Sequence, residues 1–239
     1  MEDVKNYIDN IKIEDIPWDR MITAYDTAEN YPELLKILDE MKDLDKVKQA
    51  LNKISDFEHQ STLFTPAPFV LIFLVRIYEK AINSPDNPVA VWLADRLARS
   101  FEYYTEVCDD IEKIEHPKAL ENMSDILNEN YLIPECVNIF DCDEDEFEEL
   151  NEKLFQENLF YSLYYYSGVV LAEVSHTEKT ETYRELFHLK EYSEEIIREV
   201  ILSAMKSSSV PITETAKKLN ISEDDVREIL DRTSQVWNH

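Results

Sequence analysis

The segment PAPFVLIFLVRIYEKAI, residues 66–82, decides the fold class of this chain. It is apolar on every side when drawn as a helix, which is typical of a helix at the centre of a globular protein. Its longest apolar run, residues 67–77, contains Arg76 and is shorter than the about 20 residues that span a bilayer. We therefore interpret it as a buried core helix and expect no membrane contact.

Shorter amphipathic stripes precede this core helix. Apolar residues spaced i, i+3, i+4 and i+7 begin at Val4, Trp18 and Leu34, and a similar stripe runs from Leu44 to Ile54. These stripes predict four helices. Prolines near the start of the second and third stripes suit the first turn of a helix. Helices this short are unstable alone, so we expect neighbouring helices to pack against one another.

Two longer helices are expected after residue 82. The first begins at Ser84, Asp86 or Asn87, which are good cap residues, and runs towards Ile114. The second is rich in aromatic residues and runs from about 143 to 174. A short helix around residues 120–127 separates them.

A single glycine, Gly168, occurs among the 239 residues. A glycine-rich phosphate loop is therefore excluded, and turns with positive φ should be rare. Because Glu, Lys, Leu and Ala fill the periodic segments, we predict an all-α fold. It is either an α-solenoid of stacked antiparallel helix pairs or an irregular multi-helix bundle.

The tail ITETAKKLNISEDDVREILDRT, residues 212–233, predicts a helix-turn-helix. We place it in a C-terminal trihelical element, residues 191–239, that follows a helical-repeat-like body over residues 1–190. Its second helix has five carboxylates against two arginines and would repel nucleic acid phosphates. We therefore interpret the tail as a structural or protein-docking element.

The chain is strongly acidic, with 51 Asp and Glu against 24 Lys and Arg and a formal net charge of −27. Such a charge repels nucleic acid and anionic membranes and attracts basic partners. The first residues, 1–18, do not resemble a signal peptide. Cys108, Cys136 and Cys142 lack metal-ligand spacing and fit reduced thiols. We expect a cytoplasmic protein.

Two stretches in the first third of the chain carry a resemblance. IPWDRMITAYDTAENYPELLKILDE (16–40) and QALNKISDFEHQSTLFTPAPFVL (49–71) resemble the first repeats of HEAT-like helical proteins of bacteria. Asp26 and Ser61 stand where that pattern has glycine. The resemblance implies a HEAT-like fold and a binding function, as in cytoplasmic partners or immunity proteins of polymorphic bacterial toxins. The matching residues are Trp18, Tyr25, Ala28, Pro32, Ala50, Leu51, His59, Gln60 and Thr62.

The polar HQST segment, residues 59–62, is a candidate catalytic loop. Nucleophilic catalysis needs a hydroxyl, a base and a group that orients the base, and the sequence has no nucleophile elbow. We instead predict a junction between two helices, with Thr65 as the N-cap of the core helix. His59 is expected to bond the loop or the end of the preceding helix. We expect no enzyme activity.

The segment DCDEDEFEELNE, residues 141–152, matches a calcium-binding EF-hand loop at its first, third, fifth and twelfth positions. Glu146 stands where the loop requires glycine, so we predict that Asp141 or Asp143 caps an acidic helix. Two E-x-x-H pairs, Glu173 with His176 and Glu185 with His188, are interpreted as chance. We expect no metal and no cofactor.

These observations favour an immunity protein that binds a basic toxin domain, for example a nuclease, and blocks its active site. Alternatives are a general α-solenoid scaffold and a transcriptional regulator that uses the helix-turn-helix. Acidic residues would replace phosphates and speed association, and aromatic rings among them would anchor the contact. The predicted contact residues are Tyr103, Tyr104, Asp109, Asp110, Glu112, Glu115, Asp141, Asp143, Glu144, Asp145, Glu146, Glu148 and Glu149.

Overall fold

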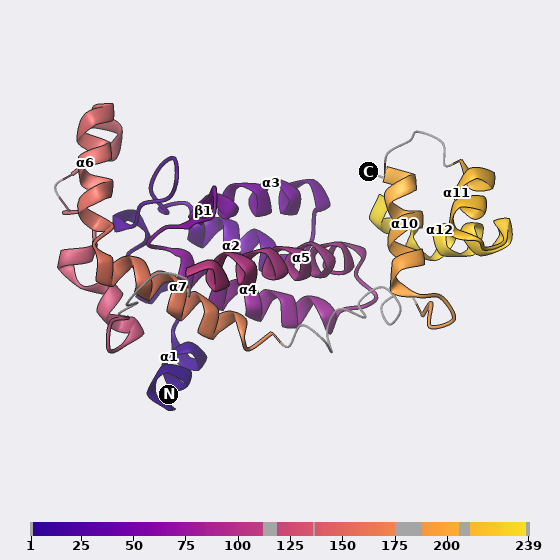
Figure 1. Cartoon of the computed structure of the whole chain (residues 1–239), viewed down its shortest axis with the longest axis horizontal. Coiled ribbons are helices and arrows are strands. Elements are labelled where there is room, and N and C mark those ends of the chain that lie inside the picture. The colour runs from indigo at the N-terminus through magenta and orange to yellow at the C-terminus, as the bar shows by residue number, and fades with distance from the viewer. Residues whose placement is uncertain (1, 112–118, 136, 175–187, 206–210, 238–239) are drawn as a thin grey trace. The chain divides into compact units, whose positions relative to one another are not determined.

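A computed structural model describes residues 2–111, 119–135, 137–174, 188–205 and 211–237 (Figure 1). These residues contain ten α-helices and one two-stranded hairpin, so the all-α prediction is confirmed. The α-helices are α1 (Glu2–Asn10), α2 (Tyr31–Glu40), α3 (Leu44–Ile54), α4 (Ala67–Ile82), α5 (Pro88–Asp110), α6 (Glu144–Leu154), α7 (Glu157–Leu171), α10 (Glu194–Met205), α11 (Ile212–Leu219) and α12 (Glu223–Trp237).

The chain forms two compact units, each assembled from separate parts of the sequence. The division that we predicted at residue 190 stays a prediction. The first unit comprises Met1–Glu40, Asp45–Ile77 and Ser100–Val174, and the second comprises Met41–Leu44, Tyr78–Arg99 and Ser175–His239.

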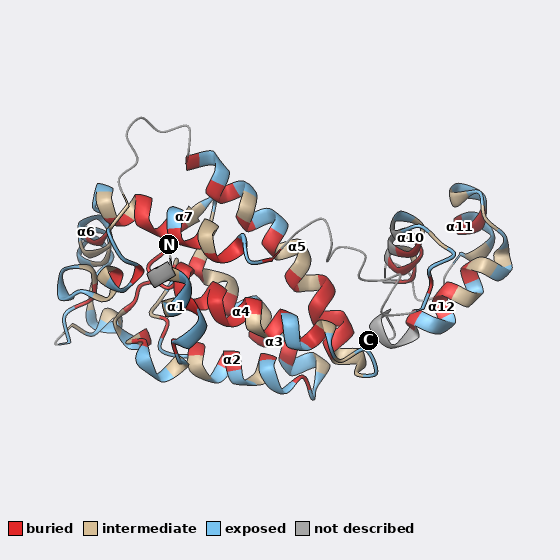
Figure 2. Cartoon of the chain, turned by 90° about the horizontal axis from the view of Figure 1, so that it is seen from below, coloured by how far each residue is buried: buried red, intermediate tan, exposed pale blue. Residues whose placement is uncertain are grey.

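Helix α4 is the buried core helix that its sequence predicts (Figure 2). Phe69, Val70 and Leu71 are fully buried within it. The guanidinium of Arg76 donates hydrogen bonds to the carbonyls of Ile11 at 2.8 Å and Ile8 at 2.5 Å, at the end of α1. The one charge in the apolar run therefore satisfies carbonyls that a helix end leaves without partners.

Helices α2 and α3 form where the third and fourth apolar stripes predict them. The second stripe does not form an α-helix, which corrects that prediction: a 3-10 turn covers Trp18–Arg20 and an irregular loop follows. In this loop the Thr23 hydroxyl donates to the carbonyl of Asp26 at 2.9 Å. Such local bonds of Thr and Asp compete with helical hydrogen bonds. Met21 and Ile22 are nevertheless buried, because the loop packs on the core.

The prediction of a single helix over residues 143–174 is also wrong, because this part of the chain forms two separate helices, α6 and α7. The chain leaves the helical conformation at Phe155 (ψ 46°) and Gln156 (ψ 149°). The break lets the Phe155 ring meet Phe64 edge to face, with ring centroids 5.4 Å apart. The free energy gained by burying aromatic surface thus exceeds the free energy gained by continuing the helix.

The junction between α3 and α4 is a short hairpin, in which Glu58–His59 (β1) pairs with Thr62–Leu63 (β2). Gln60 and Ser61 connect the strands and both have positive φ, as a type I′ turn requires. Among the described residues, positive φ also occurs at Met41, His188 and Asn220, so residues other than glycine make these turns.

The predicted N-cap role of Thr65 is wrong. Its hydroxyl bonds the backbone of Ile22, accepting from the N–H at 3.0 Å and donating to the carbonyl at 3.2 Å. Asn87 and Asp143 act as the caps we expected. The Asn87 side chain accepts from Val89 N at 3.0 Å, before α5.

In the second unit, α10, α11 and α12 pack around Ile197, Val226 and Ile229. Helix α11 ends at Asn220, which has the left-handed conformation that commonly terminates helices. The Ser222 hydroxyl then accepts from Asp225 N at 3.0 Å at the start of α12.

Candidate protein-binding surface

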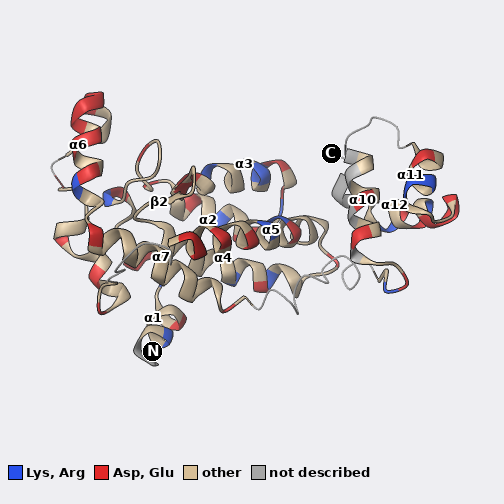
Figure 3. Ribbon diagram, viewed as in Figure 1, with Lys and Arg blue, Asp and Glu red and all other residues tan. Residues whose placement is uncertain are grey.

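Helix α6 carries the densest acidic segment of the first unit. From Asp141 to Glu152 there are eight carboxylates and no cation, and Lys153 follows (Figure 3). The side chain of Asp143 accepts from Glu146 N at 2.9 Å, so this carboxylate is the N-cap of α6. Acidic residues in the first turn are favoured by the helix dipole. The predicted contact residues from Asp141 to Glu149 all lie at the surface.

These carboxylates are not neutralised by neighbours. Within the described residues, no ion pair joins any of the eight to a cation. Glu144, Asp145, Glu148 and Glu149 are exposed on α6. The helix therefore presents uncompensated negative charge to solvent, which produces an attractive field for cationic partners.

The opposite face of α6 is apolar and fixes the helix to the first unit. Phe147 and Leu150 pack, together with the buried Leu154, on a cluster built around Ile22 and Phe64. Val137 and Ile139 pack against the same cluster from the segment before α6. The acidic face is consequently held in a defined orientation beside that segment.

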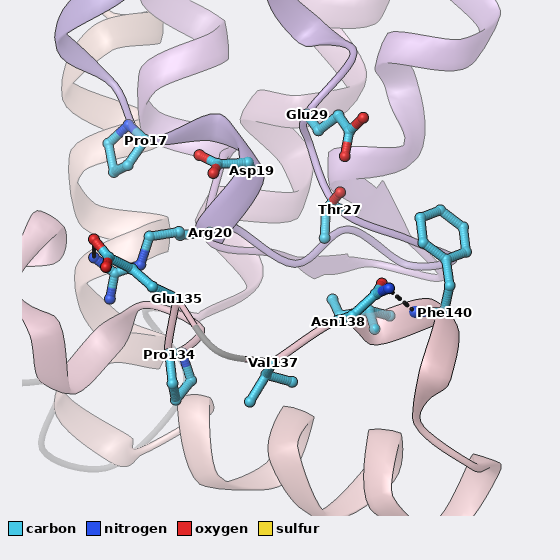
Figure 4. A pocket seen from close by; sticks show the side chains of 11 residues that line it. Pro17, Asp19, Arg20, Thr27, Glu29, Pro134, Glu135, Val137, Asn138 and Phe140 are labelled. Carbon is cyan, nitrogen blue, oxygen red and sulfur yellow. Dashed lines mark hydrogen bonds and ion pairs between the residues drawn. The ribbon is translucent and has the colours of Figure 1, made fainter.

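A cavity of about 550 Å³ opens next to this cluster (Figure 4). We call it the Phe140 pocket. Two parts of the chain far apart in sequence form it, namely the loop after α1 and the segment before α6. The lining residues are Pro17, Asp19, Arg20, Thr27, Glu29, Pro134, Glu135, Val137, Asn138, Ile139 and Phe140.

Arg20 joins the two walls of the Phe140 pocket. Its Nε donates to the carbonyl of Ile133 at 2.8 Å, and the N–H of Ile133 donates to the Arg20 carbonyl at 3.0 Å. Its guanidinium also forms two hydrogen bonds with the Glu129 carboxylate, at 2.9 and 2.5 Å. This pairing lowers the pKa of Glu129 and raises that of Arg20. Arg20 therefore has a structural role, because its hydrogen bonds connect the two walls of the pocket. We call these hydrogen bonds the Arg20 clamp.

The remaining charge around the Phe140 pocket is negative. Asp19, Glu29 and Glu135 are exposed at its rim, and only Glu135 lies near the Arg20 guanidinium, at 3.9 Å. Phe140 is 71% exposed, the largest fraction among the exposed large hydrophobic residues of the described chain. Figure 4 shows its ring beside Thr27, with Arg20 and Glu135 at the other end. The pocket thus combines an open aromatic ring with exposed carboxylates.

The other predicted contact residues lie on α5 or beyond it. Asp109 and Asp110 are exposed at its end, whereas Glu112 and Glu115 fall outside the described residues. Tyr103 is 43% exposed and donates to Glu58 at 2.8 Å.

Tyr104 does not lie at the surface: it is 5% exposed and packs on Phe57, with ring centroids 4.9 Å apart. Burial raises the pKa of its hydroxyl to about 12. Tyr104 is thus a core residue, and Tyr103 is the exposed ring of the pair.

The residues that line the Phe140 pocket were not predicted as a site. No sequence motif contains Asp19, Glu29, Glu135 and Phe140 together. Phe140 follows Ile139 and directly precedes the acidic run, and no local pattern marks its ring as exposed. Nothing in the sequence pairs the loop after α1 with the segment before α6.

In the polar hairpin, His59 contacts a tyrosine side chain. His59 Nδ1 lies 3.1 Å from the Tyr25 hydroxyl, and the two rings meet edge to face at 5.1 Å. The partner of His59 is thus a tyrosine of an earlier loop, and not its own loop or the end of the preceding helix, as we expected.

In the described part of the chain, no group of three or more His, Cys, Asp or Glu is arranged to hold a metal ion. Of the two E-x-x-H pairs, Glu173 contacts Lys5 at 3.4 Å and His188 is exposed. His176 and Glu185 lie outside the described residues.

A second cavity, of about 610 Å³, lies between the end of α5 and α7 and is lined mainly by apolar and tyrosine side chains. Burial raises the pKa of the Cys108 thiol in its wall to about 12. That thiol is therefore protonated and unreactive at neutral pH.

No family model, curated protein or solved structure matches this chain. No helix among the described residues is both long enough and apolar enough to cross a membrane. A function for either surface therefore rests on the geometry of that surface alone.

Proposed function

We propose that this protein is an acidic protein-binding module, specifically an immunity protein that neutralises a basic bacterial toxin domain, such as a nuclease, by direct binding. The observation that carries the proposal is α6, whose exposed carboxylates have no cationic partner among the described residues. A helix that carries so much uncompensated charge is supported by an apolar face that fixes its position. This arrangement suits electrostatic capture of a cationic surface.

The proposed blocking of the toxin's active site depends on the opposite charges of the two proteins. A nuclease binds phosphates with clustered Lys and Arg, and its own substrate is excluded when carboxylates occupy those cations. Opposite charges also raise association rates, up to about 10⁸–10⁹ M⁻¹s⁻¹ at low salt. The exposed end of α5, with Asp109 and Asp110, adds carboxylates to the first unit.

A HEAT-like stack of helix pairs is part of this proposal. It is supported by short connections, since residues 41–43 join α2 to α3 and residues 83–87 join α4 to α5. Short connections favour antiparallel neighbouring helices, as in helical repeats.

The alternatives have less support. A general scaffold explains the helix pairs but not the concentration of charge on α6. A transcriptional regulator would use α11 and α12 as its helix-turn-helix, but α12 begins with Glu223, Asp224 and Asp225, which repel DNA phosphates.

Charge reversal on α6 tests the proposal. The double variant Glu148→Lys/Glu152→Lys places cations beyond the first turn of the helix, where the helix dipole tolerates them. The control, Glu214→Lys/Asp231→Lys, makes the same change in charge at exposed positions of α11 and α12. The binding target is any basic toxin domain that a neighbouring reading frame encodes, and binding is measured across a salt series.

We expect the α6 variant to weaken binding by about tenfold or more, mainly through slower association and a smaller salt dependence. The control variant should bind like wild type and protect cells equally well. Unchanged affinity and salt dependence in the α6 variant would refute the proposal.

A further inference from the structure

We infer that the Phe140 pocket receives an arginine side chain of the basic partner, an inference that rests on the proposed function. The pocket and α6 then have different tasks. The carboxylates of α6 attract the partner from a distance, and the pocket holds one residue of it.

The dimensions of the Phe140 pocket fit a side chain. A volume of about 550 Å³ lies in the range of roughly 300–1,000 Å³ that is typical of ligand pockets. The walls are fixed by the hydrogen bonds that Arg20 makes with the Ile133 backbone and by the apolar cluster behind Val137 and Ile139. A cavity with fixed walls is ready for an occupant without the cost of ordering its own loops.

The charges favour a cation. Asp19 and Glu29 have no ion-pair partner within 4.0 Å among the described residues, and the one cation of the lining, Arg20, is already bonded to Glu129. An anion would meet three carboxylates at the rim, and a purely apolar side chain would leave these carboxylates unused. A cationic side chain can pair with at least one of them.

The aromatic ring favours arginine over lysine. Phe140 exposes most of its ring at one end of the pocket (Figure 4). A guanidinium is planar, stacks on an aromatic face and presents several N–H donors to carboxylates at the same time. An ammonium group is more strongly hydrated and offers a point charge only. Among interface residues, arginine and aromatic side chains are also the usual anchors.

Two synthetic peptides test the inference on the full-length chain. Both consist of glycine and lysine residues and carry the same charge, and they differ only in a central residue, which is arginine in one and lysine in the other. For wild type, calorimetric titration at low salt should give about threefold tighter binding of the arginine peptide, as expected for one exposed cation–π contact. Phe140→Ala should abolish this preference, and Phe140→Tyr should retain it. Tyr165→Ala, which removes another exposed ring of the first unit, is the matched control and should leave the preference intact.

The α6 variant Glu148→Lys/Glu152→Lys separates the two proposals. It should weaken both peptides equally and preserve the preference for arginine. Equal binding of the two peptides to wild type, with both weakened in the α6 variant, would overturn the arginine pocket and leave the acidic binding function intact. If neither peptide binds wild type, the arginine pocket fails, whereas the acidic binding function is decided by the toxin-binding experiment with the α6 variant.

Discussion

Thr65 satisfies both backbone groups of Ile22 with one hydroxyl, accepting from the N–H at 3.0 Å and donating to the carbonyl at 3.2 Å. Ile22 pairs with Thr27 in an isolated bridge whose hydrogen bonds are made by the flanking residues. The N–H and carbonyl of Ile22 therefore point away from that bridge and need another partner. Because both residues are almost fully buried, water does not supply it.

Replacement of Thr65 by Val keeps the shape of the side chain and removes the hydroxyl. We expect a loss of about 1–3 kcal/mol in the free energy of unfolding, since buried polar groups are left unpaired. Urea denaturation followed by circular dichroism measures it. Thr65→Ser retains the hydroxyl and should lose clearly less; equal losses in the two variants would contradict the role of the hydroxyl.

Ser61 occupies the second central position of the hairpin turn with φ 63°. A left-handed conformation costs a residue with a side chain about 1–2 kcal/mol, and glycine escapes this cost but loses more chain entropy on folding. We expect Ser61→Gly to be more stable than Ser61→Ala by up to about 1 kcal/mol. Both variants lack the hydroxyl, so their difference in unfolding midpoint reports the backbone alone. An alanine variant as stable as the glycine variant would show that the turn is unstrained.

Arg76 holds the end of α1 through the carbonyls of Ile8 and Ile11. Burial lowers the pKa of its guanidinium, which nevertheless stays charged at neutral pH. Arg76→Met keeps the apolar stem and removes both hydrogen bonds, at a cost of about 2–3 kcal/mol. Hydrogen exchange should show faster opening of α1 in this variant. Arg76→Lys should have an intermediate effect; unchanged protection of α1 in the methionine variant would refute this capping role.

The ion pair between Arg20 and Glu129 predicts a pH dependence. Its hydrogen bonds lower the pKa of Glu129 below its ordinary value of 4.5, so the folded state binds this proton more weakly than the unfolded chain. The stabilisation is therefore complete above about pH 4.5 and is lost as the pH falls through the lowered pKa.

Glu129→Gln should accordingly be less stable than wild type near pH 7, and the difference should shrink below about pH 4. Urea unfolding at several pH values measures it. The exposed Glu121→Gln is a suitable control, for which we expect no such convergence. A difference that is independent of pH would indicate that the charge of Glu129 is not responsible.

Local sequence signals accounted for much of the fold. Helices α2, α3 and α4 form where apolar periodicity predicts them, and Asn87 and Asp143 cap the helices that follow them. Each of these features depends on residues within one or two helical turns, so the pattern of neighbours is sufficient. The acidic character of α6 was likewise visible in the sequence.

The predictions from sequence failed where residues that are distant in the sequence contact one another. Phe155 leaves the helical path to pack on Phe64, and Thr65 bonds Ile22 in place of capping its own helix. Periodicity favours a continuous helix at Phe155, and capping preference favours an N-cap at Thr65. The gain from burial and from satisfied backbone groups exceeds these weak local preferences.

By itself, the sequence determined an all-α chain, a buried core helix and a strongly acidic surface, because composition and short-range spacing fix them. Only the tertiary structure decided that Tyr104 is buried while Phe140 is exposed, and that Asp19 and Glu29 share a pocket with Phe140. The pocket walls are more than a hundred positions apart in the chain. Their proximity results from the Arg20 clamp and the packing around Ile22 and Phe64, which no local pattern encodes.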